Sequence, residues 1–266
     1  MPHNLFTPSE RENFSIHGLI KRKNFLAPEK LAKARNLIFQ HLEQEGVWRN
    51  GGWSLDGYMR STESDTGMAL VKPLNRHPTL IDLTSGEVPA AASALVDARP
   101  IFPMDQHPAL LFTLPNATTW TLPHQNWHMD IPRLPDGGVP GVQIFACLET
   151  VETGGGGTLA VTGSHRLLNE CVRISSSDLR KRLKQEPYFA ALMSNQTDGR
   201  LRFLREGGRV GNVELQVVEM TGEPGDVYFM DLRVLHTVAP NMRQIPRLML
   251  TQRYLLEASR IALYGK

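Results

Sequence analysis

Residues 141–149 read GVQIFACLE, and their pattern indicates the secondary structure that dominates the chain. Alternate residues of a strand point to opposite faces, so the segment predicts a strand with one face formed by Val142, Ile144, Ala146 and Leu148. Further short segments of this kind, separated by Gly, Pro, Asn and Asp, are ALLFTL (109–114), GTLAVT (157–162), VELQVVEM (213–220), DVYFMDL (226–232) and RLMLTQRYLL (247–256). Many short strands with turn residues between them predict a β-sandwich or open barrel over about residues 105–260.

The chain before residue 100 has a different period. In PEKLAKARNLIFQHLEQEG (28–46), Pro28 suits a first helical turn, Gly46 suits the end, and apolar residues recur at helical spacing at Leu31, Ala34, Ile38 and Leu42. A second helical zone covers residues 77–97, with an interruption near Ser85 and Gly86. We therefore expect an α+β fold, mainly β, in which helices within about residues 1–100 buttress the strands. Residues 166–212 are charged and partly helical, which predicts an inserted lid or substrate loop.

Composition limits the classes of function. The 266 residues fit a single domain, residues 1–266, and the net charge of +2 gives no electrostatic footprint for nucleic acid or a membrane. We find no signal peptide and no apolar run long enough to span a bilayer. The two cysteines imply no disulfide framework. These features predict a cytoplasmic protein that acts on or binds a small molecule.

Residues 124–135, HQNWHMDIPRLP, contain a candidate metal site. In a strand, His128 and Asp130 would point to the same side, and together they supply two members of the two-histidine, one-carboxylate set that binds Fe(II) on one face. His124 and Asn126 form a rival pair at the same spacing. An amide is a neutral and weaker ligand, and choosing this pair would leave Asp130 unused.

The missing ligand and an anion-binding group come from further along the chain. His236 follows GDVYFMDLRVL, which indicates a turn and a strand that carry the histidine to the mouth of the fold. Arg247 opens the next strand, and its guanidinium could pair with the distal carboxylate of a 2-oxoacid whose other end chelates the metal. The ordered set His-x-Asp, His, Arg is more specific than any of its members.

With these residues in place, the chain resembles the phytanoyl-CoA dioxygenase-like branch of the Fe(II)/2-oxoglutarate oxygenases. The resemblance covers about residues 109–255 and rests on HMD (128–130), GGGGTLAVTGSH (154–165), GDVYFMDLRVLHTVAPN (225–241) and IPRLMLTQRY (245–254). It implies a double-stranded β-helix, or cupin-like jelly roll. It also implies an oxygenase that uses Fe(II), 2-oxoglutarate and O2 to hydroxylate an unactivated C–H bond and releases succinate and CO2, with desaturation or ring formation as other outcomes.

The resemblance also assigns residues. It implies that Fe(II) is bound by His128, Asp130 and His236, and that 2-oxoglutarate is anchored by Arg247. Two further residues, Lys72 and Phe145, fall roughly where family members place other parts of the 2-oxoglutarate pocket. Members often carry a small polar residue two positions after the distal histidine, whereas this chain has Val238, so Thr237 or another hydroxyl would have to compensate.

Several competing interpretations concern these motifs. The four glycines 154–157 lack the Lys-Ser/Thr of a phosphate loop, and we expect a structural role for them and for His165. Arg133 and the arginines at 200, 202, 205 and 209 could meet an anionic substrate, but a solvated face is the simpler interpretation. A non-redox, cupin-like metal-binding protein and a Zn(II) hydrolase are alternatives to the oxygenase. Arg247 weighs against the first, and the absence of a convincing general-base Glu near the motif weighs against the second.

Overall fold

The computed structural model describes residues 5–55, 67–131, 138–167, 175–196 and 199–264. Its helices are α1 Pro8–His17, α2 Pro28–Gln44, α3 Met68–Val71, α4 Pro78–Leu83, α5 Glu87–Ala94, α6 Ser176–Leu183, α7 Pro187–Leu192 and α8 Glu257–Tyr264, with short 3₁₀ turns η2 Lys72–Arg76, η3 Ser164–Arg166 and η4 Arg200–Leu204. Its strands are β1 Leu19–Arg22, β2 Trp48–Arg49, β3 Gly52–Trp53, β4 Ile101–Pro103, β5 Ala109–Thr113, β6 Gly141–Cys147, β7 Thr158–Thr162, β8 Gly208–Val210, β9 Val213–Glu219, β10 Val227–Asp231, β11 Leu235–Val238 and β12 Arg247–Leu256. Each of the six segments that the first paragraph predicts as strands contains one.

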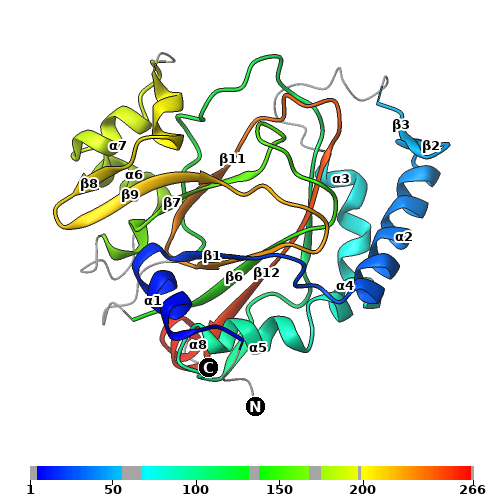
Figure 1. Cartoon of the computed structure of the whole chain (residues 1–266), viewed down its shortest axis with the longest axis horizontal. Coiled ribbons are helices and arrows are strands. Elements are labelled where there is room, and N and C mark those ends of the chain that lie inside the picture. The colour runs from blue at the N-terminus through cyan, green and yellow to red at the C-terminus, as the bar shows by residue number, and fades with distance from the viewer. Residues whose placement is uncertain (1–4, 56–66, 132–137, 168–174, 197–198, 265–266) are drawn as a thin grey trace.

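Two antiparallel sheets form the jelly roll, which confirms the predicted fold (Figure 1). The major sheet has the order β1-β10-β6-β12-β4, and β5 pairs with the other end of β12. The minor sheet has the order β11-β7-β9-β8. Helices α2, α3 and α4 gather beside the major sheet, while α6 and α7 lie against β8 and β9 of the minor sheet (Figure 1). None of the helices in the described ranges has the length and apolar character needed to cross a membrane.

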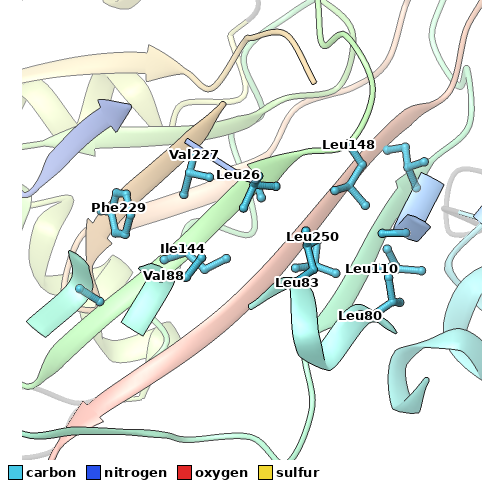
Figure 2. Close-up of a cluster of buried hydrophobic side chains, with 14 of the residues drawn as sticks. Leu26, Leu80, Leu83, Val88, Leu110, Ile144, Leu148, Val227, Phe229 and Leu250 are labelled. Atoms are coloured by element: carbon cyan, nitrogen blue, oxygen red, sulfur yellow. The ribbon is translucent and has the colours of Figure 1, made fainter. Parts of the chain in front are cut away.

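The N-terminal helices pack on the outer face of the major sheet. The even-numbered residues of β6 and its extension, Val142, Ile144, Ala146 and Leu148, join Leu248 and Leu250 of β12 in this cluster, as the alternation predicts. Leu80 and Leu83 of α4 and Val88 of α5 lie against them from the helical side (Figure 2). Burial of apolar surface at about 25 cal/mol per Å² is the main stabilising contribution of this layer.

The predicted helices are confirmed, with physical reasons for their ends. In α2, Ala34, Ile38 and Leu42 are fully buried, whereas Leu31 is only half-buried. Gly46 follows the helix with φ 75°, a left-handed conformation that glycine adopts without steric cost. Helices α4 and α5 are separated at Ser85-Gly86, as expected.

The insertion forms a separate apolar layer. The described part of residues 166–212 packs on the outer face of the minor sheet, where Leu179, Phe189 and Phe203 share a cluster with Leu159 and Val161 of β7. These residues therefore cover the outside of the minor sheet. The lid role stays a prediction, and residues 168–174 and 197–198 lie outside the described ranges.

Candidate functional site

A cavity of about 370 Å³ lies between the two sheets. Its wall combines side chains from β5, β6, β7, β11 and β12 with the loop that carries His128 and Asp130. The candidate ligands His128, Asp130 and His236 and the candidate anchor Arg247 all line this cavity. These four residues come from three separate places in the sequence and meet in one cavity.

One pair of backbone hydrogen bonds fixes the two histidines side by side. The N–H of His128 donates to the carbonyl of His236 at 3.0 Å, and the N–H of His236 donates to the carbonyl of His128 at 2.8 Å. The expected strand at His128–Asp130 is therefore wrong in extent, because the structure has an isolated bridge at His128. The bridge still places the two imidazole centroids 4.3 Å apart.

The carboxylate of Asp130 lies against both rings. Its two oxygens are each 3.9 Å from a histidine Nε2, Oδ1 from that of His128 and Oδ2 from that of His236. All three ligand atoms lie within 4.8 Å of one another. Two donors that each sit about 2 Å from one ion are separated by at most about 4 Å, so these carboxylate–imidazole distances suit a shared ion. His128 is 40% exposed and His236 only 6%, which leaves the cluster open on one side.

Backbone carbonyls orient both imidazoles. The Nδ1 of His128 is 2.7 Å from the carbonyl oxygen of Asn126, and the Nδ1 of His236 is 3.0 Å from that of Val234. A carbonyl oxygen only accepts, so each Nδ1 carries a proton and each Nε2 presents its lone pair to the cluster. This is the tautomer that binds metals through Nε2. Burial also lowers the pKa of His236, and although Asp130 opposes this effect, the net change favours the neutral ring.

His124 and Asn126, the alternative ligand pair, lie outside the cluster of His128, Asp130 and His236. Asn126 contributes its backbone carbonyl, and its φ of 63° is the left-handed conformation that asparagine tolerates better than most residues. The His124 side chain lines a separate groove together with Arg180 and Met193. Trp127 and Met129 are buried in the apolar cluster of the minor sheet.

A further ion pair, between Arg253 and Asp105, lies beside the Asp130 carboxylate. Arg253 donates to both oxygens of Asp105 at 2.8 and 2.9 Å, and its Nη1 lies 3.7 Å from Asp130 Oδ1. Asp105 and Arg253 both line the cavity. Sequence reasoning missed them, because the two residues are 148 positions apart and only the pairing of β4 with β12 brings them together.

Arg247 is a buried cation without a carboxylate partner among the described residues. Only 4% of it is exposed, its Nη1 lies 3.4 Å from the Oγ1 of Thr158, and its Nε has no hydrogen-bond partner. Burial lowers the pKa of Arg247 to about 10, a value at which the group is still charged at neutral pH. A buried charge is costly unless it is paired, so this end of the cavity is suited to an anionic ligand.

The two residues added by the resemblance lie in different places. Phe145 lines the cavity, and its ring centroid is 6.1 Å from that of His236. Lys72 begins η2, is exposed, and is not among the described residues of the cavity wall. Val238 lines the cavity with an apolar side chain.

Gln143 lines the cavity, on the face of β6 opposite the residues that contact the helices. The sequence analysis assigned it no role. The hydroxyl of Thr251 donates to the carbonyl of Ile144 at 2.8 Å, so its oxygen accepts from the amide nitrogen of Gln143 at 3.1 Å. This chain of donors fixes the direction of the amide. The Gln143 Oε1 is then a buried acceptor without a partner.

The remaining motifs are structural. His165 is buried outside the cavity, with its Nε2 2.9 Å from the carbonyl oxygen of Ser15, and Gly154 donates its N–H to the carboxylate of Glu219. Of the arginines in the insertion, Arg200 bonds to a backbone carbonyl and Arg209 pairs with Glu214. The described cavity wall includes none of the four arginines at 200, 202, 205 and 209. Arg133 lies outside the described residues.

The fold recurs in solved structures. The chain is similar to AviO1 from Streptomyces viridochromogenes Tue57, with a TM-score of 0.57, 21% identity and coverage of 96% of this chain and 97% of that one. It is similar to the non-heme alpha ketoglutarate dependent carbocyclase SnoK from nogalamycin biosynthesis (TM-score 0.56, 18% identity, 95% and 85% coverage). It is also similar to EctD from S. alaskensis, solved with 2-oxoglutarate and 5-hydroxyectoine (TM-score 0.56, 13% identity, 96% and 77% coverage).

Sequence comparison identifies the family. The comparison with curated proteins gave no match. The sequence model of the family described as Phytanoyl-CoA dioxygenase (PhyH) matches residues 14–249, which include the cluster of His128, Asp130 and His236 as well as Arg247. The match extends over most of the chain and agrees with the two-sheet fold and with the contents of its cavity. The chain therefore belongs to the phytanoyl-CoA dioxygenase family of Fe(II)/2-oxoglutarate-dependent oxygenases.

Proposed function

We propose that the protein is an Fe(II)- and 2-oxoglutarate-dependent dioxygenase that hydroxylates an unactivated C–H bond of a small molecule. The observation that carries this proposal is one cavity that holds both a His-Asp-His cluster with inward Nε2 atoms and a buried arginine without a carboxylate partner among the described residues. The first suits a divalent metal and the second suits the distal carboxylate of a 2-oxoacid.

Each residue has a defined part in this proposal. The Nε2 atoms of His128 and His236 and the carboxylate of Asp130 would hold Fe(II), and Arg247 would pair with 2-oxoglutarate. When bound, the iron and 2-oxoglutarate would activate O2, so that one oxygen atom would enter the C–H bond as a hydroxyl group and the other would enter succinate, with release of CO2. The carbonyls of Asn126 and Val234 keep the two imidazoles in the ligating tautomer.

The rest of the cavity orients the substrate and excludes water. Phe145 and Leu111 provide apolar wall, and the pair of Arg253 with Asp105 holds Asp130 from one side. Because Arg253 is already paired, the outer part of the cavity has no surplus positive charge among its described residues. The unpartnered Oε1 of Gln143 suits a hydroxyl or amine donor on the substrate.

Hydroxylation is favoured over the other outcomes by two points. EctD, a protein of this fold, was solved with a hydroxylated compound, 5-hydroxyectoine. Asp130 is a carboxylate, whereas halogenating relatives replace that ligand to make room for chloride. The description of SnoK as a carbocyclase shows that ring formation also occurs on this fold, so the product has to be identified directly.

A pure binding protein is the second candidate, because the cluster alone could hold a metal without turnover. The buried Arg247 weighs against it, since a non-redox metal binder has no use for a 2-oxoacid anchor. The test is succinate release from 2-oxoglutarate in air by the Fe(II)-loaded protein, with a panel of small hydroxylated and aminated molecules as stimulants. We expect His128→Ala to abolish succinate formation and His124→Ala to preserve it. Equal activity of the His128→Ala variant would refute the proposal.

A further inference from the structure

A groove of about 630 Å³ lies beside the loop that carries His128. One of its walls is the loop segment 124–126, and the other combines the C-terminal end of α6 with α7 and the residues that follow it. The described walls of the groove and of the metal cavity have no residue in common. The groove is therefore a separate space, which the chemistry at the His-Asp-His cluster leaves unused.

The groove presents two cations and no carboxylate. Arg180 and Lys184 line it, and its described wall contains neither Asp nor Glu. Among the described residues, Lys184 has no ion pair, and Arg180 bonds to a backbone carbonyl instead of a carboxylate. The carboxylate of Asp178, on the same helix, is bound by Ser175 and Lys181. Two positive charges thus face the groove without a counterion from the described part of the chain.

The spacing of the two cations favours a bound anion with more than one charge. The N–H of Lys184 donates to the carbonyl of Arg180 at 3.0 Å, so the helical turn continues between these residues. Side chains four residues apart are neighbours on one face of a helix, and like charges at this spacing destabilise it. A phosphate monoester carries about two negative charges at neutral pH and three acceptor oxygens. It balances both cations, whereas a carboxylate balances one.

The groove adjoins the metal cluster through the backbone of residues 126–128. The Nη1 of Arg180 donates to the carbonyl of Trp127 at 3.1 Å, and the preceding carbonyl, that of Asn126, accepts from the Nδ1 of His128 at 2.7 Å. Two residues of extended chain span at most about 7 Å. The separation between the groove wall and the metal ligand is thus within the length of a small molecule.

We propose that the groove binds a phosphate group of the substrate through Arg180 and Lys184, while the carbon to be hydroxylated lies at the cluster of His128, Asp130 and His236. The inference rests on the proposed function, because it names the class of substrate, a small phosphorylated molecule. Arg180 both binds the phosphate and holds the loop before His128. Lys184 contributes its charge alone, so its substitution reports on the anion without disturbing the loop.

The test compares three-carbon ligands that differ at one end. Protein loaded with Fe(II) and 2-oxoglutarate is titrated under nitrogen, by calorimetry, with glycerol phosphate, glycerate and glycerol. We expect saturable binding of glycerol phosphate, binding of glycerate that is weaker by about 10-fold or more, and no binding of glycerol. Lys184→Gln should weaken binding of glycerol phosphate about 3- to 10-fold, and Arg180→Gln about 10- to 100-fold, because the guanidinium can form two parallel hydrogen bonds.

Lys181→Gln is the matched control. It removes the same charge from the same helix, but Lys181 pairs with Asp178 and is not part of the described groove wall. We expect its affinity for glycerol phosphate to stay within about 2-fold of the wild type. The charge-transfer band of bound 2-oxoglutarate shows in each variant that the metal site is intact, and Lys184→Gln serves as the test if Arg180→Gln does not fold.

The contradicting results are separable. No saturable binding of glycerol phosphate to the wild type, or equal affinity in the wild type and Lys184→Gln, would overturn the groove as a phosphate site while the proposed function stands. Equal affinity for glycerate and glycerol phosphate would overturn the assignment to phosphate. Absence of the 2-oxoglutarate band in a protein whose phosphate binding still depends on Lys184 would overturn the proposed function, and with it the role of the groove in substrate binding.

Discussion

Replacing Arg247 by methionine should affect affinity and stability in opposite directions. Arg247 is 4% exposed, and burial lowers its pKa from the ordinary value of 12.5 to about 10. That change corresponds to about 3 kcal/mol of destabilisation of the charged side chain at neutral pH. Arg247→Met removes this cost and loses only the hydrogen bond to Thr158, which contributes about 1 kcal/mol. We therefore expect the ligand-free variant to be more stable than the wild type by about 1–2 kcal/mol.

The same substitution should nearly abolish cosubstrate binding. A carboxylate about 4 Å from the guanidinium, at an effective dielectric constant of about 20, is attracted by about 4 kcal/mol. Its loss corresponds to about a 100- to 1000-fold increase in the Kd for 2-oxoglutarate. Urea unfolding without ligand and anaerobic calorimetry with Fe(II) and 2-oxoglutarate measure the two effects. Unchanged affinity, or a ligand-free variant that is clearly less stable than the wild type, would refute the reasoning.

Arg233 provides the matched control. It is also buried, but it forms a two-oxygen pair with Asp231. Arg233→Met would leave the Asp231 carboxylate buried without this partner, and we expect a loss of about 3–5 kcal/mol in the free energy of unfolding. If Arg247→Met raises the free energy of unfolding and Arg233→Met lowers it, the charge of Arg247 is unpaired in the ligand-free protein and available to an anionic ligand.

Three further predictions concern the scaffold. Burial alone would raise the pKa of Asp226, but the ion pair with Lys21 and hydrogen bonds from backbone N–H groups lower it. The stability that Asp226 contributes is therefore present above its ordinary pKa and is lost as the pH falls through the lowered value. The difference in unfolding free energy between wild type and Asp226→Asn, measured from pH 7 to pH 2, should vanish at the acid end. Gly18 has φ 70°, and an added Cβ would lie 2.6 Å from the His165 ring, so Gly18→Ala should lower the unfolding free energy by more than about 2 kcal/mol in urea titrations. Burial raises the pKa of the Cys147 thiol to about 12, so iodoacetamide at about pH 8 should label Cys147 only after denaturation, as peptide mass spectrometry can establish.

Much of the fold could be predicted because its signals are local. Alternation along β6 separates the helix-facing residues from Phe145 and Gln143, and helical spacing defines α2. The grouping of His128, Asp130 and His236 could be predicted as well, since His128 and Asp130 are close in sequence and His236 follows a recognisable strand. The extent of the strand at His128 was wrong, because one bridge to His236 is enough to position the ring.

The remaining site features depend on register and long-range pairing, which one sequence does not reveal. The bond between Arg253 and Asp105 requires β4 to lie beside β12, and the position of Thr158 near Arg247 requires two sheets to face each other. The carbonyl that orients His128 depends on the left-handed conformation of Asn126. Lys72 was placed near the pocket by resemblance alone, and the structure exposes its side chain.

The most direct test of the central claim is an anaerobic titration of the purified protein with Fe(II) and then with 2-oxoglutarate, followed by visible absorption. If His128, Asp130 and His236 hold iron and Arg247 anchors the cosubstrate, a weak charge-transfer band should appear and saturate at one 2-oxoglutarate per chain. The band should be absent in His236→Ala and should decay with formation of succinate when O2 is admitted. A folded wild-type protein that gives neither the band nor succinate would contradict the account.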